Sequence, residues 1–215
     1  MELFKHTLYI NLDERTDRKT HVEKELRYMD ITGHRFSAIK HEIGAIGCAL
    51  SHIECLQIAK RNNYSQIFIC EDDIQFLQPE LLKYKIKQFN DDKNLCNWDV
   101  LMIGGNVCPP YIKTYNSCVQ IANGQTTTGY IVKSHYYDTL INNYNEGLQL
   151  LLNNPTKTSS FALDIYWKKL QITGKWYIII PLTVTQYPNY SNIEKRDTNY
   201  TFLMLDLEKK WLFQK

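Results

Sequence analysis

The stretch Gly44–Asp73, GAIGCALSHIECLQIAKRNNYSQIFICEDD, joins a helix pattern, a strand pattern and three acids without a break. Apolar residues recur in its first half at spacings of four and three, which predicts one buried face of a helix. Those residues are Ile46, Leu50, Ile53 and Leu56. The apolar run QIFIC, Gln66–Cys70, predicts a buried strand directly before the acids. A helix followed by a buried strand is typical of a parallel sheet covered by helices.

The same alternation continues on both sides of this stretch. Strands are expected at Thr7–Leu12, at residues 34–39 and at Trp98–Gly104, and helices at Arg18–Met29 and from Pro79 to about residue 89. Crossover connections between parallel strands are nearly always right-handed, so the strands end at one common edge of the sheet. Ligands of such sheets bind at that edge.

The second half of the chain is less regular. CVQIANGQTTTGYIVK, residues 118–133, predicts two strands around the Asn123-Gly124 turn, which is typical of a hairpin. Helices are expected at Ser134–Leu152 and near Ala162–Gln171, followed by strands in WYIIIP and TVTQY. The fold class predicted is α/β, with a Rossmann-like, mostly parallel sheet and an added antiparallel portion. We expect residues 1–215 to form a single domain, because no linker divides them.

Composition narrows the choice of partner and compartment. The formal net charge is +2, from 25 basic and 23 acidic residues, and no long run of like charges is present, so nucleic acid is not an expected partner. The N-terminal MELFKHTLYINL lacks an apolar signal core, and WYIIIPL is far shorter than the roughly 20 residues of a membrane span. We therefore expect a cytoplasmic protein.

The 6 cysteines form no Cys-x-x-Cys pair, which favours buried, reduced thiols over a zinc site or disulfides.

The acids Glu71, Asp72 and Asp73 follow a strand that is expected to end at the ligand edge. In extended backbone Glu71 and Asp73 point the same way, so both carboxylates can face one divalent ion. Oxygen ligands select magnesium or manganese. A solvated loop, or a helix N-terminus that favours acids, explains the triplet equally well when it is taken alone.

Five stretches of the chain together match one known family in the family's order. They are YINLDERTDR (Tyr9–Arg18), GAIGCALSHIECLQIAK followed by IFICEDD (within Gly44–Asp73), WDVLMIGG (Trp98–Gly105), TTGYIVKSH (Thr127–His135) and ALDIYW (Ala162–Trp167). On these stretches the chain resembles glycosyltransferase family 25, which contains bacterial lipooligosaccharide galactosyltransferases and collagen galactosyltransferases. The resemblance implies a nucleotide-sugar-dependent transferase with a GT-A type fold that inverts configuration at the anomeric carbon.

The resemblance also implies residues that bind the donor. Ile10, Asn11 and Leu12 would line the base and ribose, and Arg18 could bind the diphosphate through its guanidinium. For Arg15 a solvated helix face beside neighbouring acids is the preferred interpretation.

The acidic motif corresponds to the metal site of the family. Asp73 is the first choice for a direct ligand of manganese or magnesium, with Glu71 beside it. Asp72 would instead hold the ribose or a helix end.

Three further positions carry family roles with open alternatives. Asp164 corresponds to the catalytic base that takes the proton of the acceptor hydroxyl, although an acid in a first helical turn is also common. Thr128 and Gly129 match a segment, beginning at Thr127, that approaches the donor sugar and the acceptor. Gln186 would contact metal or phosphate, or be a plain strand residue. The family's final segment departs here, because Asn192 replaces an aspartate and no histidine precedes Gln186, so a third protein metal ligand is not predicted.

The pair Ser51-His52 and the nearby Cys48 admit a catalytic and a structural interpretation. A buried, hydrogen-bonded histidine is favoured on an apolar helix. Cys48 with His52 as its base would require a third, orienting group and an oxyanion hole, and the sequence indicates neither.

The sequence therefore predicts an inverting glycosyltransferase that moves a hexose, galactose or glucose first, from a UDP-sugar to a hydroxyl of a glycan or protein. A catalytically silent sugar-nucleotide or glycan-binding module is the first alternative, and a metal-dependent hydrolase is the second. In the tail, Leu203, Leu207 and Trp211 recur every four residues, which predicts a helix that packs on the domain or, as the second interpretation, contacts a membrane surface.

Overall fold

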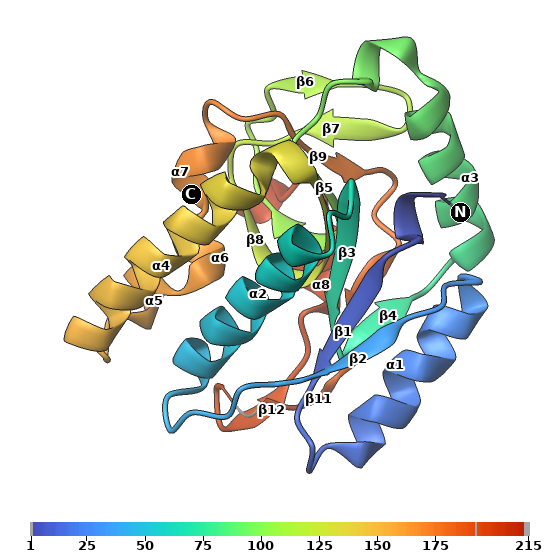
Figure 1. Cartoon of the computed structure of the whole chain (residues 1–215). Helices are drawn as coiled ribbons and strands as arrows, with labels where there is room; N and C mark the ends of the chain where they lie inside the picture. Colours follow the sequence, from blue (N-terminus) through green and yellow to red (C-terminus); the bar gives the residue numbers. More distant parts are fainter. Residues whose placement is uncertain (1, 192, 213–215) are drawn as a thin grey trace.

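The computed structural model describes residues 2–191 and 193–212. Its centre is an eight-stranded sheet with the strand order β2-β1-β3-β8-β5-β9-β7-β6 (Figure 1). The strands of this sheet are β1 (Thr7–Asn11), β2 (His34–Ser37), β3 (Gln66–Glu71), β5 (Val100–Val107), β6 (Lys113–Thr114), β7 (Cys118–Gln120), β8 (Gly124–Lys133) and β9 (Trp176–Ile179). Strands β2, β1 and β3 are parallel to one another, as are β5 and β9. This confirms the α/β prediction of a mostly parallel sheet with an antiparallel portion.

Strand β8 runs antiparallel between β3 and β5 and joins the two parallel groups. The expected hairpin at Asn123-Gly124 is therefore wrong, although both of its strands form. Strand β7 pairs with β9 and β6 instead. The physical reason is burial: β8 is buried on both of its faces from Thr127 to Val132, so it is more stable in the middle of the sheet than at a hairpin edge.

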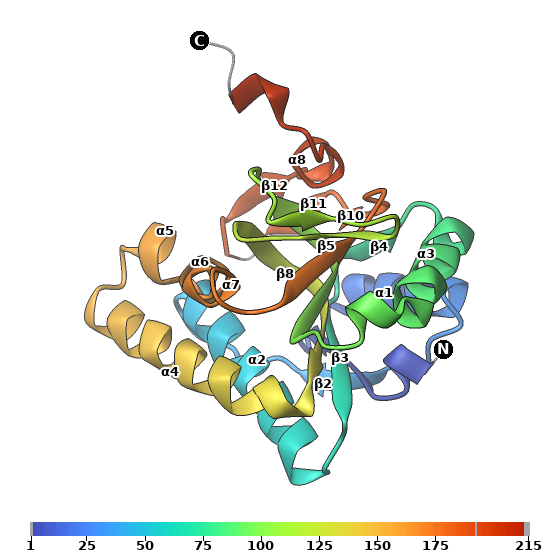
Figure 2. The same ribbon diagram turned by 90° about the horizontal axis from the view of Figure 1, so that it is seen from above.

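The helices cover both faces of the sheet, as Figure 2 shows from above. Their bounds are α1 (Thr16–Tyr28), α2 (Gly44–Arg61), α3 (Pro79–Asp91), α4 (Tyr137–Asn153), α5 (Thr158–Phe161), α6 (Leu163–Tyr166), α7 (Lys168–Gln171) and α8 (Thr201–Leu205), with short 3₁₀ turns at Glu2–Phe4, Lys93–Leu95, Ser134–Tyr136 and Lys210–Leu212. Helices α2 and α4 pack on one face and α1 and α3 on the other. The expected helix near Ala162–Gln171 is split into α6 and α7.

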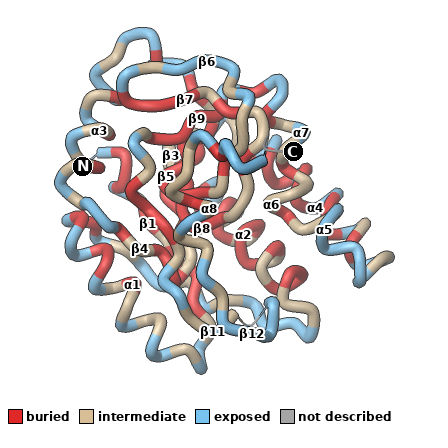
Figure 3. The backbone as a smooth tube through the Cα atoms, turned by 180° about the vertical axis from the view of Figure 1, so that it is seen from behind, coloured by how far each residue is buried: buried red, intermediate tan, exposed pale blue. Residues whose placement is uncertain are grey.

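Successive apolar side chains of the central strands point to opposite faces of the sheet, so each face carries an apolar layer. In β3, Ile67 and Ile69 pack toward α2 and α4, whereas Phe68 and Cys70 pack toward α1 and α3. The same alternation occurs in β5, β8 and β9, because successive side chains of a strand point to opposite faces. The buried layers run through the middle of the molecule in Figure 3.

Two small two-stranded sheets lie beside the large one. Strand β4 (Ile74–Phe76) pairs with β10 (Val184–Gln186), and β11 (Asn189–Ser191) pairs with β12 (Arg196–Thr198). The first pairing places Gln186 opposite Ile74, directly after the acid triplet. Segments more than 100 residues apart in the sequence are thereby brought to one place.

The C-terminal tail does not form the helix predicted from its four-residue spacing. Helix α8 ends at Leu205, and Asp206 accepts hydrogen bonds from the amides of Glu208 and Lys209, which turns the chain away. Of the predicted apolar face, Leu207 packs against the core and Leu203 is half-buried, whereas Trp211 is exposed, so the tail packs on the domain in part but not as one continuous helix. Among the described residues, none of the helices combines the length and the apolar character that a membrane crossing requires. Peripheral membrane contact stays a prediction.

Candidate active site

A cleft of about 770 Å³ opens where β1, β2 and β3 end. Most of the site residues predicted from the sequence line it: Ile10, Leu12, Arg18, Glu71, Asp72, Asp73, Asp164 and Gln186. Asn11, Thr128 and Gly129 do not. The carboxyl edge of the parallel strands is therefore the edge at which the polar residues gather, as expected for this class of sheet.

The acid triplet ends β3 and turns into β4, so its three carboxylates lie at the cleft. Asp72 accepts a hydrogen bond from the Asn11 amide at 2.7 Å and one from the Arg18 guanidinium at 2.9 Å. Arg18 also reaches a carboxylate oxygen of Asp73 at 3.2 Å. The Gln186 amide nitrogen lies 3.4 Å from Glu71 Oε2 and 3.4 Å from Asp73 Oδ1. One amide therefore faces two carboxylates, which shows that Glu71 and Asp73 converge.

Negative charge in this cluster exceeds what Arg18 neutralises. Asp73 is only 8% exposed, and its burial, with the nearby charge of Glu71, raises its pKa to about 7 in spite of Arg18. The pKa of Asp72 is also raised by burial, against the opposing effects of Arg18 and Asn11. A carboxylate with a raised pKa in a cleft indicates a site that favours an added positive charge.

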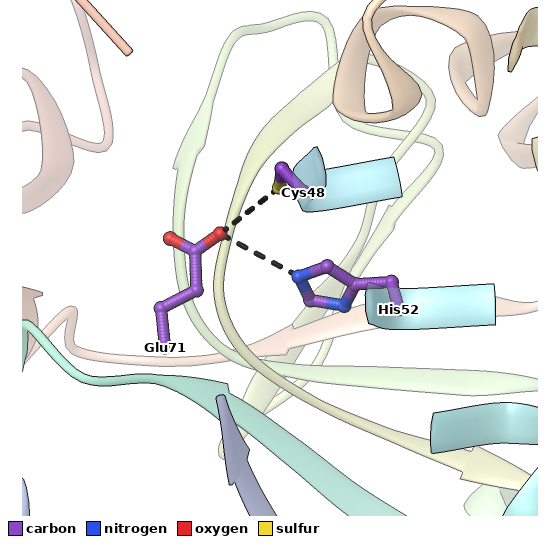
Figure 4. Close-up of side chains that lie close together, drawn as sticks. All are labelled: Cys48, His52 and Glu71. Atoms are coloured by element: carbon purple, nitrogen blue, oxygen red, sulfur yellow. Dashed lines mark hydrogen bonds and ion pairs between the residues drawn. The ribbon is translucent and has the colours of Figure 1, made fainter. Parts of the chain in front are cut away.

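Glu71 directs its other oxygen, Oε1, away from Asp73 and toward helix α2. Oε1 accepts a hydrogen bond from the Thr127 hydroxyl at 2.6 Å. It also lies 3.6 Å from Cys48 Sγ and 3.5 Å from His52 Nε2 (Figure 4). His52 is fully buried, and its Nδ1 lies 2.8 Å from the Tyr130 hydroxyl, so the prediction of a buried, hydrogen-bonded histidine is confirmed.

Cys48 has an orienting neighbour that the sequence did not indicate. The sequence indicated no third group beside Cys48 and His52, but the structure places Glu71 next to both. Burial, followed by the charge of Glu71, raises the pKa of the Cys48 thiol well above its ordinary value. A protonated thiol is a weak nucleophile, so the conclusion stands for a different reason.

Asp164 lies in the first turn of α6, yet it does not cap that helix. Its Oδ2 accepts a hydrogen bond from the backbone amide of Thr126 at 3.0 Å, which fixes the carboxylate against β8. Burial raises the pKa of Asp164, the Thr126 amide opposes this, and the charge of Glu71 adds to it. A fixed carboxylate in a cleft with a raised pKa suits a proton acceptor better than a surface acid.

The sequence did not indicate Thr126, which holds Asp164. Its φ of +69° is uncommon for a β-branched residue. Its hydroxyl accepts a hydrogen bond from the backbone N–H of Asn106 at 3.2 Å. The pairing of β5 with β8 is irregular on both sides of Gly104, next to this contact. Strain of this kind occurs at functional sites, but neither Thr126 nor Asn106 belongs to a motif that reveals it.

A second part of the wall that was missed is the segment 38–42, between β2 and α2. The Ile39 amide donates to the Ser51 hydroxyl at 2.8 Å, and Ser51 donates to the Gly47 carbonyl at 2.7 Å. A methyl group on Gly47 would lie only 2.4 Å from the Ile39 carbonyl oxygen. Gly47 and Ser51 therefore hold this segment against the start of α2, where it lines the cleft.

Three predicted donor contacts lie behind the wall of the cleft. Asn11 is 1% exposed and holds Asp72, so it positions an acid. Thr128 is fully buried. A methyl group on Gly129 would meet Ile74 at 2.8 Å, so this glycine serves close packing and not the approach to a ligand that was expected.

Two further positions from the sequence analysis, Arg15 and Asn192, remain to be placed. Arg15 pairs with the neighbouring Asp17 at 2.8 Å, but its side chain is only 14% exposed and lines the cleft, so the interpretation as a solvated helix face is wrong. Asn192, at which the final segment departs from the family, lies outside the described residues.

Residues 42–152 match the model of glycosyltransferase family 25, described as LPS biosynthesis protein. This range covers more than half of the chain. The chain belongs to glycosyltransferase family 25. The matched range contains the acid triplet, α2 with Cys48 and His52, and all of β8.

Among solved structures, this family 25 chain is similar to a glycosyltransferase involved in the glycosylation of the major capsid of PBCV-1. The two are 12% identical, the alignment covers 80% of each chain and the TM-score is 0.51, so they share a fold. A Drosophila β-galactosyltransferase 7 in complex with manganese, UDP-Gal and xylobiose is 13% identical over 98% of this chain and 79% of that chain, with a TM-score of 0.46. No curated protein matches the sequence. By family the chain is a glycosyltransferase.

Proposed function

We propose that this family 25 chain transfers a hexose from a UDP-sugar to a hydroxyl of a glycan or protein acceptor, with metal assistance and inversion at the anomeric carbon. The observation that carries the proposal is that the acid triplet, Arg18 and Asp164 line one cleft at the ligand edge of the sheet. Galactose and glucose are the first candidates for the hexose, as expected from the resemblance to the family.

Ile10, Leu12 and the segment 38–42 line one part of the cleft, and they are our candidates for binding the base and ribose. Arg18 is the candidate for the diphosphate. It donates to Asp72, to Asp73 and, at 3.0 Å, to the Tyr190 carbonyl, so its guanidinium is fixed before a donor arrives. A planar guanidinium held in this way matches the geometry of phosphate oxygens.

The residues at the triplet fit a hard divalent cation. Glu71 Oε2 and Asp73 Oδ1 converge on one amide, and the raised pKa of Asp73 reflects uncompensated negative charge. These two oxygens would hold manganese or magnesium, which prefer carboxylate ligands. When bound, such an ion supplies positive charge where the nucleoside diphosphate leaves.

Asp164 is the candidate for the base. The acceptor oxygen attacks the anomeric carbon, its proton passes to the Asp164 carboxylate, and the bond from the anomeric carbon to the phosphate oxygen breaks with its electron pair on the diphosphate. The backbone amide of Thr126 keeps Oδ2 in place. Burial raises the pKa of Asp164 toward the pKa of an effective base at neutral pH. One proton acceptor is enough for a single displacement, and a single displacement inverts configuration.

A cytoplasmic location stays a prediction. It is supported by the six free cysteines, since free thiols are typical of a reducing compartment.

A screen of sugar nucleotides with manganese tests the proposal. We expect one UDP-sugar to bind and to release UDP, and Asp73→Asn to lose manganese-dependent donor binding. Asp91→Asn, which changes an exposed aspartate at the end of α3, is the matched control and should behave as the native protein. Donor binding without turnover in the presence of varied acceptors would favour the silent binding module, and failure of every sugar nucleotide to bind would contradict the proposal.

A further inference from the structure

Two metal-ligating side chains that the proposed transfer reaction does not use, Cys48 and His52, lie beside Glu71 of the acid triplet. Cys48 and His52 are four residues apart on α2, so they lie on the same face of the helix. Glu71 meets them from the end of β3 (Figure 4). The thiol sulfur, an imidazole nitrogen and a carboxylate oxygen of these three residues all lie within 4.8 Å of one another.

We propose that Cys48, His52 and Glu71 form a zinc-binding site in the wall of the cleft. A thiol together with an imidazole selects a thiophilic cation such as Zn²⁺ over the hard ions that carboxylates alone prefer. Three protein ligands with one open position are the arrangement of a zinc site that remains accessible to a further ligand. All three side chains line the cleft, which leaves the fourth position on the open side.

The spacing of the atoms fits tetrahedral zinc. With Zn–S of about 2.3 Å and Zn–N and Zn–O of about 2.1 Å, tetrahedral angles place S and O about 3.6 Å apart and N and O about 3.4 Å apart. The structure has 3.6 Å from Cys48 Sγ to Glu71 Oε1 and 3.5 Å from His52 Nε2 to the same oxygen. Both distances match edges of the tetrahedron; the sulfur–oxygen distance is also that of a hydrogen bond from the thiol, whereas the nitrogen–oxygen distance is longer than an ordinary hydrogen bond.

Further support comes from His52 Nε2, which lies at ion-pair distance from Glu71 Oε1 but makes no hydrogen bond to a described residue. This residue is fully buried, and its Nε2 has no hydrogen-bond partner among the described residues although it points at Glu71. A buried polar atom without a partner is costly, and coordination of a metal would remove that cost.

Groups behind the ligands are arranged as in other metal sites. The Tyr130 hydroxyl lies 2.8 Å from His52 Nδ1 and fixes the ring, and the Thr127 hydroxyl donates to the ligating oxygen of Glu71. Such partners orient ligands and select the imidazole tautomer. Charge also balances, since one thiolate and one carboxylate neutralise a divalent cation. Glu71 Oε2 remains directed to the triplet, so the two sites use different oxygens of one carboxylate.

Cobalt binding to the full chain tests the site without any donor sugar, so the result is independent of the proposed transferase activity. We expect Co²⁺ to give the metal-free protein a near-ultraviolet thiolate-to-cobalt absorption band, which reports only cobalt bound to a thiolate, and Zn²⁺ to remove that band. Cys48→Ser should abolish the band, whereas Cys96→Ser, which changes an exposed cysteine, should leave it intact. Asp73→Asn should also leave it intact, which separates this site from the proposed donor-metal site.

Two measurements keep the proposal testable if Cys48→Ser fails to fold. Tyr130→Phe retains all three ligands and should weaken zinc binding by about 10- to 100-fold. In the native protein, Zn²⁺ should slow alkylation of Cys48 by iodoacetamide but not that of Cys96, as measured by peptide mass spectrometry. Absence of a thiolate band, or equal alkylation of Cys48 with and without Zn²⁺, would overturn the proposal and leave the cluster as a hydrogen-bonded support for Glu71.

Discussion

Replacing Asp73 by asparagine should make the metal-free protein more stable at pH 8. In the native protein Asp73 is 8% exposed and shares its surroundings with Glu71 and Asp72, and Arg18 compensates only part of this negative charge. Above its pKa of about 7 the carboxylate is ionised in the folded state at a cost in free energy. Asparagine has nearly the same shape and carries no charge, so it removes that cost.

The magnitude follows from the difference between the folded and unfolded pKa values. In the folded state the pKa is about 7 and the ordinary value is 3.8, so between these values the folded state holds a proton that the unfolded state has released. The stability of the native protein therefore falls as pH rises from about 4 to about 7. At about 1.4 kcal/mol for each pKa unit, the loss amounts to about 4 kcal/mol at pH 8. For a chain of this size that corresponds to a change in Tm on the order of 10 °C.

Thermal unfolding followed by circular dichroism in a chelating buffer measures this effect. Asp73→Asn should match the native protein near pH 4 and exceed its Tm progressively up to pH 8, while Asp91→Asn should follow the native protein at every pH. In a buffer without a chelator, added manganese should raise the Tm of the native protein more than that of Asp73→Asn. A stability difference that does not change with pH, or an Asp73→Asn protein that is less stable at pH 8, would refute the reasoning.

Three further predictions concern the walls of the cleft. Arg18→Gln leaves two buried acids without their counter-charge, so it should lower the unfolding free energy by about 3 kcal/mol at pH 8. Urea denaturation measures this loss, which should be smaller near pH 5. An equal loss at both pH values would contradict the charge argument. Gly47→Ala forces a methyl group against the Ile39 carbonyl and should destabilise the fold by about 1–3 kcal/mol in the same assay, and an unchanged stability would mean that the segment 38–42 moves freely. With manganese saturating, kcat should fall on acidification through a pKa above the ordinary aspartate value, because Asp164 must be ionised to accept a proton; a kcat that is constant down to pH 4 would exclude this role.

The helices and parallel strands could be predicted from local patterns. Helix α2 occupies Gly44–Arg61 and contains the four residues whose apolar periodicity predicts it. The position of β8 could not be predicted this way, because the Asn123-Gly124 pair favours a local turn while the partners of β8 lie far away in the sequence. Burial on both faces favours a place for β8 between β3 and β5. That burial depends on helices from other parts of the chain.

The candidate site shows the same division. Glu71, Asp73 and Asp164 could be singled out because acids at a sheet edge or a helix start have a recognisable chemistry. Thr126 has no such signature, since its contribution is a backbone amide aimed by an unusual φ. The proposed zinc site could not be predicted from the sequence either. Cys48 and His52 lie together on α2, but the third ligand, Glu71, is brought beside them from β3 only by the fold.

Comparing Asp164→Asn with the native protein, for donor binding and for turnover, tests the proposed mechanism most directly. Calorimetry with the active UDP-sugar and manganese should give the same dissociation constant for both proteins, because Asp164 is not a proposed ligand of the donor phosphates or the metal. The rate of transfer should fall by about 10²- to 10⁴-fold in the variant, as expected for loss of a general base. Full transfer activity in Asp164→Asn, or loss of donor binding together with activity, would contradict the assignment of Asp164 as the base in this cleft.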